Sequence, residues 1–162
     1  MNTTGESSEI RETLVRALGW EDGHVGFETA VAGLLPEHRA TIPAGLPYSI
    51  WQVAEHIRLT QRDILEFCYD PEYQERHWPD DYWPQSADPP DESTWQATCA
   101  AVADDRNALA RLVRDSARSL VAPIPHGDGQ TLLREAVLVI DHTAYHVGQI
   151  VLLRKALGAW GT

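Results

Sequence analysis

Cysteine and positive charge are both scarce in this chain of 162 residues. The two cysteines, Cys68 and Cys99, are too few for the disulfide framework of a secreted domain, so we expect a reduced, cytoplasmic setting. Lys and Arg total 13 against 24 Asp and Glu, which gives a formal net charge of -11. Because polyanions repel such a chain, we expect it to bind neither nucleic acid nor an anionic membrane surface.

The sequence also lacks a long apolar run. Its most strongly apolar stretch, residues 136–140, is far shorter than the roughly 20 residues that span a bilayer. The N-terminal residues have no basic start and no apolar core, so we expect no signal peptide. With 43% hydrophobic and 23% charged residues, the composition is that of a globular chain, and we expect one domain over residues 1–162.

Apolar residues recur at the spacing of an α-helix in four segments, and no segment has the pattern of a strand. The first segment covers residues 7–35, with a kink expected near Gly19 and Gly23, and Pro36 stops the pattern. The second covers residues 49–69 and opens with a capping-box pattern.

The third and fourth helical segments also have recognisable ends. The third is expected to begin at Ser93, and the fourth runs from the N-cap Thr131 to residue 157, where Gly158 follows. The fold class is therefore all-α: an up-and-down four-helix bundle with long inter-helix loops.

One of these loops is unusual. Residues 70–92 contain five prolines, together with Trp78, Tyr82 and Trp83. A long loop inside a compact domain is often a lid or a binding loop. We favour a simpler interpretation, in which the segment is a crossover held to the core by its tryptophans, because aromatic side chains commonly anchor a loop by burial.

Three of the seven histidines lie in apolar helical surroundings. His142 and His146 are four residues apart, so their rings project from one face of the fourth helix about 6 Å apart. His56 lies within the second helix. Buried imidazoles need partners for both nitrogens, and a divalent metal bound by three of them meets that need while keeping a position open for water. The alternative is a set of core histidines that are simply hydrogen-bonded.

The positions of these histidines along their helix axes test the metal hypothesis. In an up-and-down bundle the second and fourth helices run parallel. His56 then lies roughly 6–12 Å from the level of His142 and His146, counted from the helix starts, so the two helices must be staggered along their axes.

Two acids share the faces of these histidines. Glu135 precedes His142 by seven residues and Asp63 follows His56 by seven, so each points nearly the same way as its histidine. Either acid could accept a hydrogen bond from a metal ligand or act as a general base, and we assign the base to Glu135. Asp63 is expected to be a solvated acid near a helix end. His24 could reach a substrate pocket if its segment packs at the metal end.

Two segments of the chain together resemble the DinB superfamily. They are residues 141–150, DHTAYHVGQI, preceded by GDGQT at 127–131 and by Arg134 and Glu135, and residues 49–57, SIWQVAEHI. The resemblance covers nearly the whole chain. It implies a four-helix bundle that binds a divalent metal through His56, His142 and His146, and that can form a homodimer. Three imidazole nitrogens suit zinc, nickel, iron or copper, and we expect zinc, nickel or iron.

The resemblance also implies candidate activities. Some members are similar to thiol S-transferases and isomerases that use a low-molecular-weight thiol, and others to hydrolases. Our first hypothesis is therefore a metal-dependent enzyme acting on a small-molecule substrate. The second is a non-catalytic module that binds a metal or a ligand in a stress response. The third is a plain helical bundle.

Overall fold

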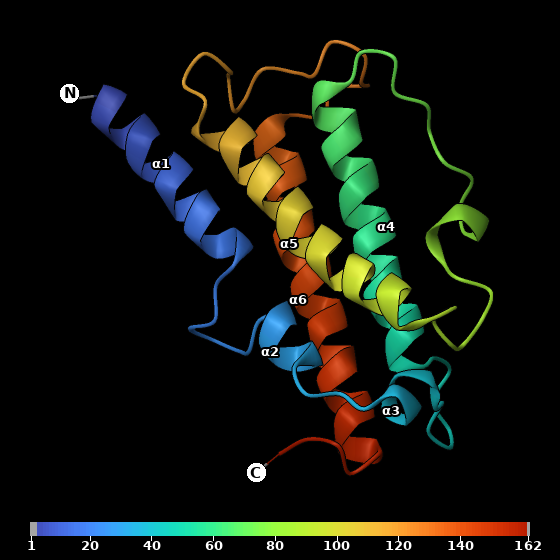
Figure 1. The fold of residues 1–162 in the computed structure, drawn as a ribbon. Helices are drawn as coiled ribbons and strands as arrows, with labels where there is room; N and C mark the ends of the chain where they lie inside the picture. Colours follow the sequence, from blue (N-terminus) through green and yellow to red (C-terminus); the bar gives the residue numbers. More distant parts are fainter. Residues whose placement is uncertain (1–2, 162) are drawn as a thin grey trace.

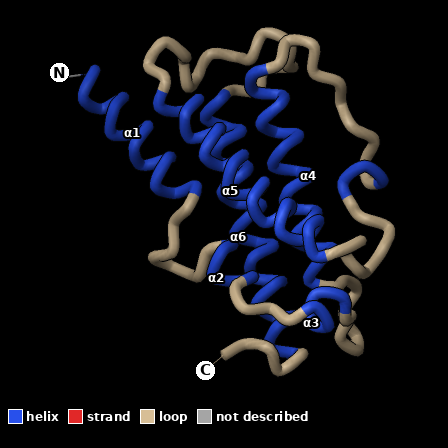
Figure 2. The backbone as a smooth tube through the Cα atoms, in the orientation of Figure 1, coloured by secondary structure: helices blue, strands red, loops and turns tan. Residues whose placement is uncertain are grey.

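Helices make up all the regular elements of residues 3–161, the part of the chain that the computed structural model describes (Figure 2). The elements are α1 (Thr3–Leu18), α2 (Phe27–Val31), α3 (Pro36–Ala40), α4 (Ile50–Tyr69), the 3₁₀-helix η1 (Asp80–Tyr82), α5 (Glu92–Arg114) and α6 (Leu132–Ala156). The prediction of an all-α chain is confirmed for these residues. The single domain expected over residues 1–162 includes residues 1, 2 and 162, which lie outside the described part.

The first predicted segment, 7–35, is not one kinked helix. The chain leaves α1 after Leu18 and does not resume a helix until Phe27. Pro36 begins α3 and does not merely end the preceding pattern. Proline has no backbone N–H, and at the first position of a helix this is no loss because an N–H there would have no partner within the helix. Gly33, with φ of 67°, supplies the left-handed backbone of the turn between α2 and α3.

The starts of the long helices follow their capping residues. At α4, Ser49 Oγ accepts from the Gln52 backbone N–H and Gln52 accepts in return, so the predicted capping box is present. At α6, Thr131 is the N-cap as predicted. The start of α5 differs, because the side chain of Asp91, not Ser93, accepts from Thr94 N.

The four long helices, α1, α4, α5 and α6, lie side by side (Figure 1). Side-chain hydrogen bonds pair α4 with α5 in the same order along both helices: 55 with 98, 61 with 102 and 62 with 105. These two helices are therefore parallel, whereas α1 and α6 run the other way (Figure 1). The expected up-and-down order fails at α5, and α4 and α6 are antiparallel rather than parallel.

The long loop explains this topology. Helix α4 has 20 residues and is about 30 Å long, so the chain must travel that distance back before α5 can run parallel to it. Residues 70–91 make this return along the outer side of α4 (Figure 1). The segment is a crossover, as we favoured, but its buried anchor is Tyr82, while Trp78 is 70% exposed.

The core consists of two apolar clusters. One contains Ile64, Leu109 and Val139, and the other contains Ile57 and Val147, each with neighbours from several helices. On α6 the residues between Val139 and Val147 include both predicted metal-binding histidines, so these lie between the clusters. Helix α6 is long and apolar enough to cross a membrane by length and composition alone, which is weak evidence because the core helix of a soluble protein passes the same test.

Candidate metal centre

The structure brings His56, His142 and His146 together. One ring nitrogen from each lies within 4.8 Å of the other two, and His56 Nε2 is 3.1 Å from His142 Nε2. The antiparallel direction of α6 makes this possible without the axial stagger that a parallel arrangement would need. Each histidine therefore lies on the helix that the sequence predicted. The predicted way in which they meet, on two parallel and staggered helices, was wrong because α4 and α6 are antiparallel.

Hydrogen bonds set the orientation of two of the rings. His56 Nδ1 donates to the backbone carbonyl of Tyr82 at 2.8 Å. His146 Nδ1 lies 2.7 Å from Gln149 Oε1, to which it donates. Because Nδ1 carries the proton in both rings, each Nε2 keeps a lone pair available for a cation.

Burial keeps these histidines neutral. Loss of solvation lowers the pKa of His56 to about 4 and that of His142 to about 3, and it also lowers the pKa of His146. His56 and His146 are buried, and His142 is half-buried, so the cluster reaches solvent on the side of His142. Neutral imidazole is the form that binds metals.

The donor set fits a divalent metal. Two nitrogens on a tetrahedral zinc, with bonds of about 2.0–2.1 Å, are about 3.3 Å apart, close to the observed separation of the two Nε2 atoms. Imidazole nitrogens suit zinc, nickel, copper and iron. Among the described residues no fourth His, Cys, Asp or Glu joins the group, so three ligands would leave a coordination position open.

Aromatic rings surround the cluster. Trp83 stacks on His56 with ring centroids 3.9 Å apart and planes 6° apart, and Tyr48 stacks on the other side of Trp83 at 4.3 Å. Tyr145 meets His146 edge to face at 4.9 Å. The Trp83 stack covers one face of the His56 ring and restricts its rotation.

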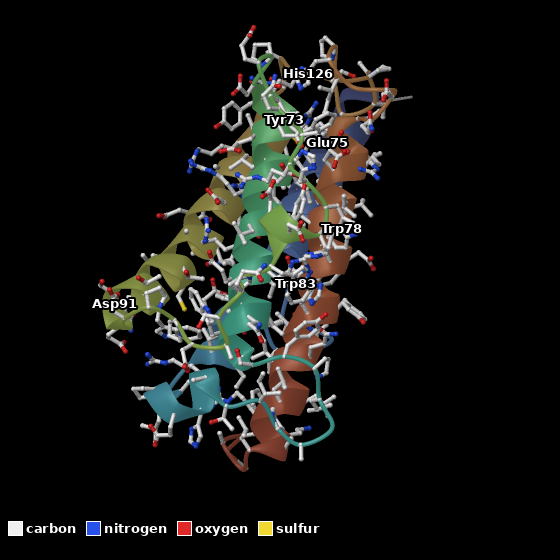
Figure 3. All side chains as sticks on the ribbon, turned by 90° about the vertical axis from the view of Figure 1, so that its right-hand side faces the viewer. Tyr73, Glu75, Trp78, Trp83, Asp91 and His126 are labelled. Atoms are coloured by element: carbon white, nitrogen blue, oxygen red, sulfur yellow. The ribbon has the colours of Figure 1, made fainter. Side chains whose placement is uncertain are left out.

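The two acids lie together on one side of the histidines. Asp63 is seven residues after His56 and Glu135 is seven before His142, and because α4 and α6 are antiparallel both steps lead the same way, by about 10 Å. Both acids line a cavity of about 430 Å³ with Tyr73, Tyr82, His126 and Arg134, among other residues. In Figure 3, Tyr73, Glu75 and His126 gather toward the upper ends of α4 and α6, with Trp78 and Trp83 lower down between these helices.

The environments of these acids differ from expectation in one case. Asp63 is not solvated but buried, and it accepts hydrogen bonds from the hydroxyls of Tyr73 and Tyr82. Glu135 is 2% exposed and pairs with Arg134 at 2.7 Å. The sequence pattern could not show the burial of Asp63, because the covering residues come from the loop.

His24 and the cysteines lie outside the cluster. His24 is exposed and borders a different cavity, of about 300 Å³, with Phe27, Arg106 and Val147 among its lining residues. Burial raises the pKa of Cys68 to about 12 and that of Cys99 to about 11, so neither thiol is activated.

Two contributors to the site escaped the sequence reasoning. The Tyr82 carbonyl has no sequence signal, because a backbone oxygen is available at every residue. Gln149 had one: it lies three residues after His146, which places it on the same helical face.

Fold and site together define a helical protein with a candidate three-histidine metal centre. A family comparison matches residues 20–150 to the DinB superfamily. The chain belongs to this superfamily. No curated protein and no solved structure matches the chain.

Proposed function

We propose that this chain binds a divalent metal ion through His56, His142 and His146 and acts as a metal-dependent enzyme on a small molecule. The observation that carries the proposal is the convergence of three neutral imidazoles from two antiparallel helices, with no fourth ligand among the described residues. A structural metal site is usually closed by four protein ligands, whereas a catalytic site keeps a position for water or substrate.

The chain's own residues would prepare the site. When bound, a divalent metal supplies Lewis acidity that lowers the pKa of a coordinated water or thiol. The Tyr82 carbonyl and Gln149 hold two ligand rings in the metal-binding tautomer. Trp83 covers one face of the His56 ring and restricts its rotation. The proposed reaction class is transfer to or from a low-molecular-weight thiol, or hydrolysis, with zinc, nickel or iron as the metal.

We place the rest of the substrate in the cavity of about 430 Å³ that Asp63 and Glu135 line, although none of the three histidines lines it. Its lining includes Asp63, Glu75, Asp128 and Glu135 against one lining arginine, Arg134, which favours a ligand that donates hydrogen bonds. Glu135 lies about 10 Å along α6 from His142. We therefore propose that Glu135, as general base, acts on a part of the substrate lying in this cavity rather than on an atom at the metal.

Metal analysis tests the first half of the proposal. The protein, purified without a metal-affinity tag and titrated with Co²⁺, should bind one ion per chain and develop visible absorption. His142→Ala should weaken binding at least about tenfold, because one of three ligands is gone. His24→Ala, a histidine outside the cluster, is the matched control and should bind as the wild type does. If His142→Ala still binds one Co²⁺ ion per chain with wild-type affinity, the assignment of the metal site to these histidines is wrong.

Thiol addition tests the second half. Added to the cobalt protein, a small thiol should change the visible spectrum by entering the open position. A panel of electrophiles and esters should then reveal turnover that Glu135→Gln reduces. Tight metal binding with no thiol response and no turnover would instead support the non-catalytic binding module.

A further inference from the structure

Asp63 is a buried carboxylate that the loop 70–91 surrounds. Its Oδ1 accepts from the Tyr73 hydroxyl at 2.9 Å and its Oδ2 from the Tyr82 hydroxyl at 2.7 Å. Arg76 Nε lies 3.4 Å from Oδ1. All three donors come from the loop, and Asp63 comes from α4, the helix that carries His56. A single α4 side chain therefore fastens the loop to this helix at three points.

The same stretch of loop holds His56. Tyr82 uses its hydroxyl on Asp63 and its backbone carbonyl on His56 Nδ1, so one residue bridges the acid and the histidine. The next residue, Trp83, stacks on the His56 ring. Displacement of Tyr82 would remove the carbonyl that fixes the His56 tautomer. It would also shift Trp83, whose ring stacks on the His56 ring.

We propose that Asp63 is a positioning residue for the metal centre: by anchoring Tyr82, it holds His56 in the orientation and tautomer that bind the metal. This inference rests on the proposed metal function. Asp63 itself lies about 10 Å along α4 from His56 and is not a ligand. Its action is transmitted through the loop.

The chemistry of Asn at this position gives a sharp test. Asp63→Asn keeps the shape of the side chain but replaces one acceptor oxygen with an amide that donates. One of the two tyrosine hydroxyls then faces an N–H group and can only accept from it, so its own O–H loses its acceptor, and the charge that pairs with Arg76 is removed. The loop should loosen at Tyr82 although every proposed ligand is still present.

The experiment compares Co²⁺ affinity with stability in matched variants. Asp63→Asn should weaken Co²⁺ binding about 10- to 100-fold, the usual effect of losing an outer-shell partner, and should alter the visible spectrum of the cobalt protein. The control is Asp105→Asn. Asp105 is also buried and pairs with Arg62 at 2.8 Å, on the α5 side of α4. This control should lower the melting temperature but change Co²⁺ affinity by less than about twofold.

Tyrosine variants keep the inference testable if Asp63→Asn does not fold. Tyr82→Phe removes the hydroxyl but leaves the carbonyl, and it should weaken Co²⁺ binding in the same direction. Tyr73→Phe removes a donor outside the Tyr82 bridge and should have a smaller effect. Combining Asp63→Asn with Tyr82→Phe should cost less affinity than the two single losses together, because both break one connection.

The outcomes separate the two proposals. Failure of the wild-type chain to bind Co²⁺ would overturn the metal function itself. Wild-type affinity and an unchanged spectrum in Asp63→Asn and Tyr82→Phe, with stability lowered, would show that Asp63 only fastens the loop, and the positioning role would be rejected.

Discussion

Gln149 orients His146 as Tyr82 orients His56, but it does so with a side chain that can be replaced. Gln149→Leu removes the acceptor for His146 Nδ1, so we expect Zn²⁺ affinity to fall about tenfold. Gln149→Glu keeps an acceptor oxygen and should retain most of the affinity. Competition with a chromophoric chelator measures both, and equal affinity in the Leu variant would mean that packing alone holds the His146 ring.

The two thiols should be inert. Because burial raises the pKa of Cys99 to about 11 and that of Cys68 to about 12, the reactive thiolate is scarce at pH 8. Iodoacetamide should label the native protein at least about 100-fold more slowly than free cysteine, and both sites should react after unfolding. Rapid labelling of the native chain at either site would show a thiol with a catalytic or redox role.

At the residue scale the sequence was most informative about the proposed metal ligands. The spacing of His142 and His146, together with their apolar neighbours, placed both on one face, and the structure brings His56 to them. The sequence was least informative about groups that act through a backbone atom or that are covered by a loop. Asp63 has the pattern of a solvated acid because nothing in α4 reveals that Tyr73 and Tyr82 will cover it.

At the scale of the element, the start of α4 is fixed twice. Ser49 Oγ accepts from Gln52 N and donates to the Ala87 carbonyl at 2.7 Å, so it caps the helix and also binds the end of the loop. Ser49→Ala should therefore cost about 1–2 kcal/mol in the free energy of unfolding. Thr131→Ala, which removes an N-cap bond in an exposed position, should cost about 1 kcal/mol or less. Urea unfolding compares them, and equal losses would argue against the second role of Ser49.

The helices were predictable and their directions were not. Apolar spacing and caps located α4, α5 and α6 to within a few residues, because these are local properties. The direction of α5 depends on whether the loop 70–91 makes a short turn or a full return, and loop composition does not settle that choice. The error at α5 changed α4 and α6 from parallel to antiparallel, and with it the explanation of how the histidines meet.

At the scale of the molecule, the buried histidines make the metal-free protein sensitive to acid. The folded-state pKa values of His56, about 4, and of His142, about 3, lie below the ordinary value of 6.5, so the unfolded chain binds more protons between these limits. The free energy of unfolding that His56 contributes above pH 6.5 is therefore lost as the pH falls toward 4, and the contribution of His142 is lost as it falls toward 3.

Urea unfolding of the chelator-treated protein at pH 7 and pH 5 measures this loss. His142→Gln cannot be protonated and should show a smaller difference between the two pH values. His24→Gln, at an exposed histidine, should keep the wild-type difference. An unchanged pH dependence in His142→Gln would mean that other groups cause the acid sensitivity.

Metal should counter this sensitivity. An ion that binds only the folded chain raises the melting temperature in proportion to the logarithm of its concentration above the Kd. We expect Zn²⁺ to raise the melting temperature at pH 7 and to do so less in His146→Ala. A shift of equal size in the variant would place the ion elsewhere.

The proposed metal ligands His56 and His142 are separated by 86 positions in the chain. The proposed metal site can therefore form only after α6 has been synthesised and has packed against α4. A chain cut between α5 and α6 would place His56 on one fragment and His142 and His146 on the other, and we expect a divalent metal to promote their reassociation.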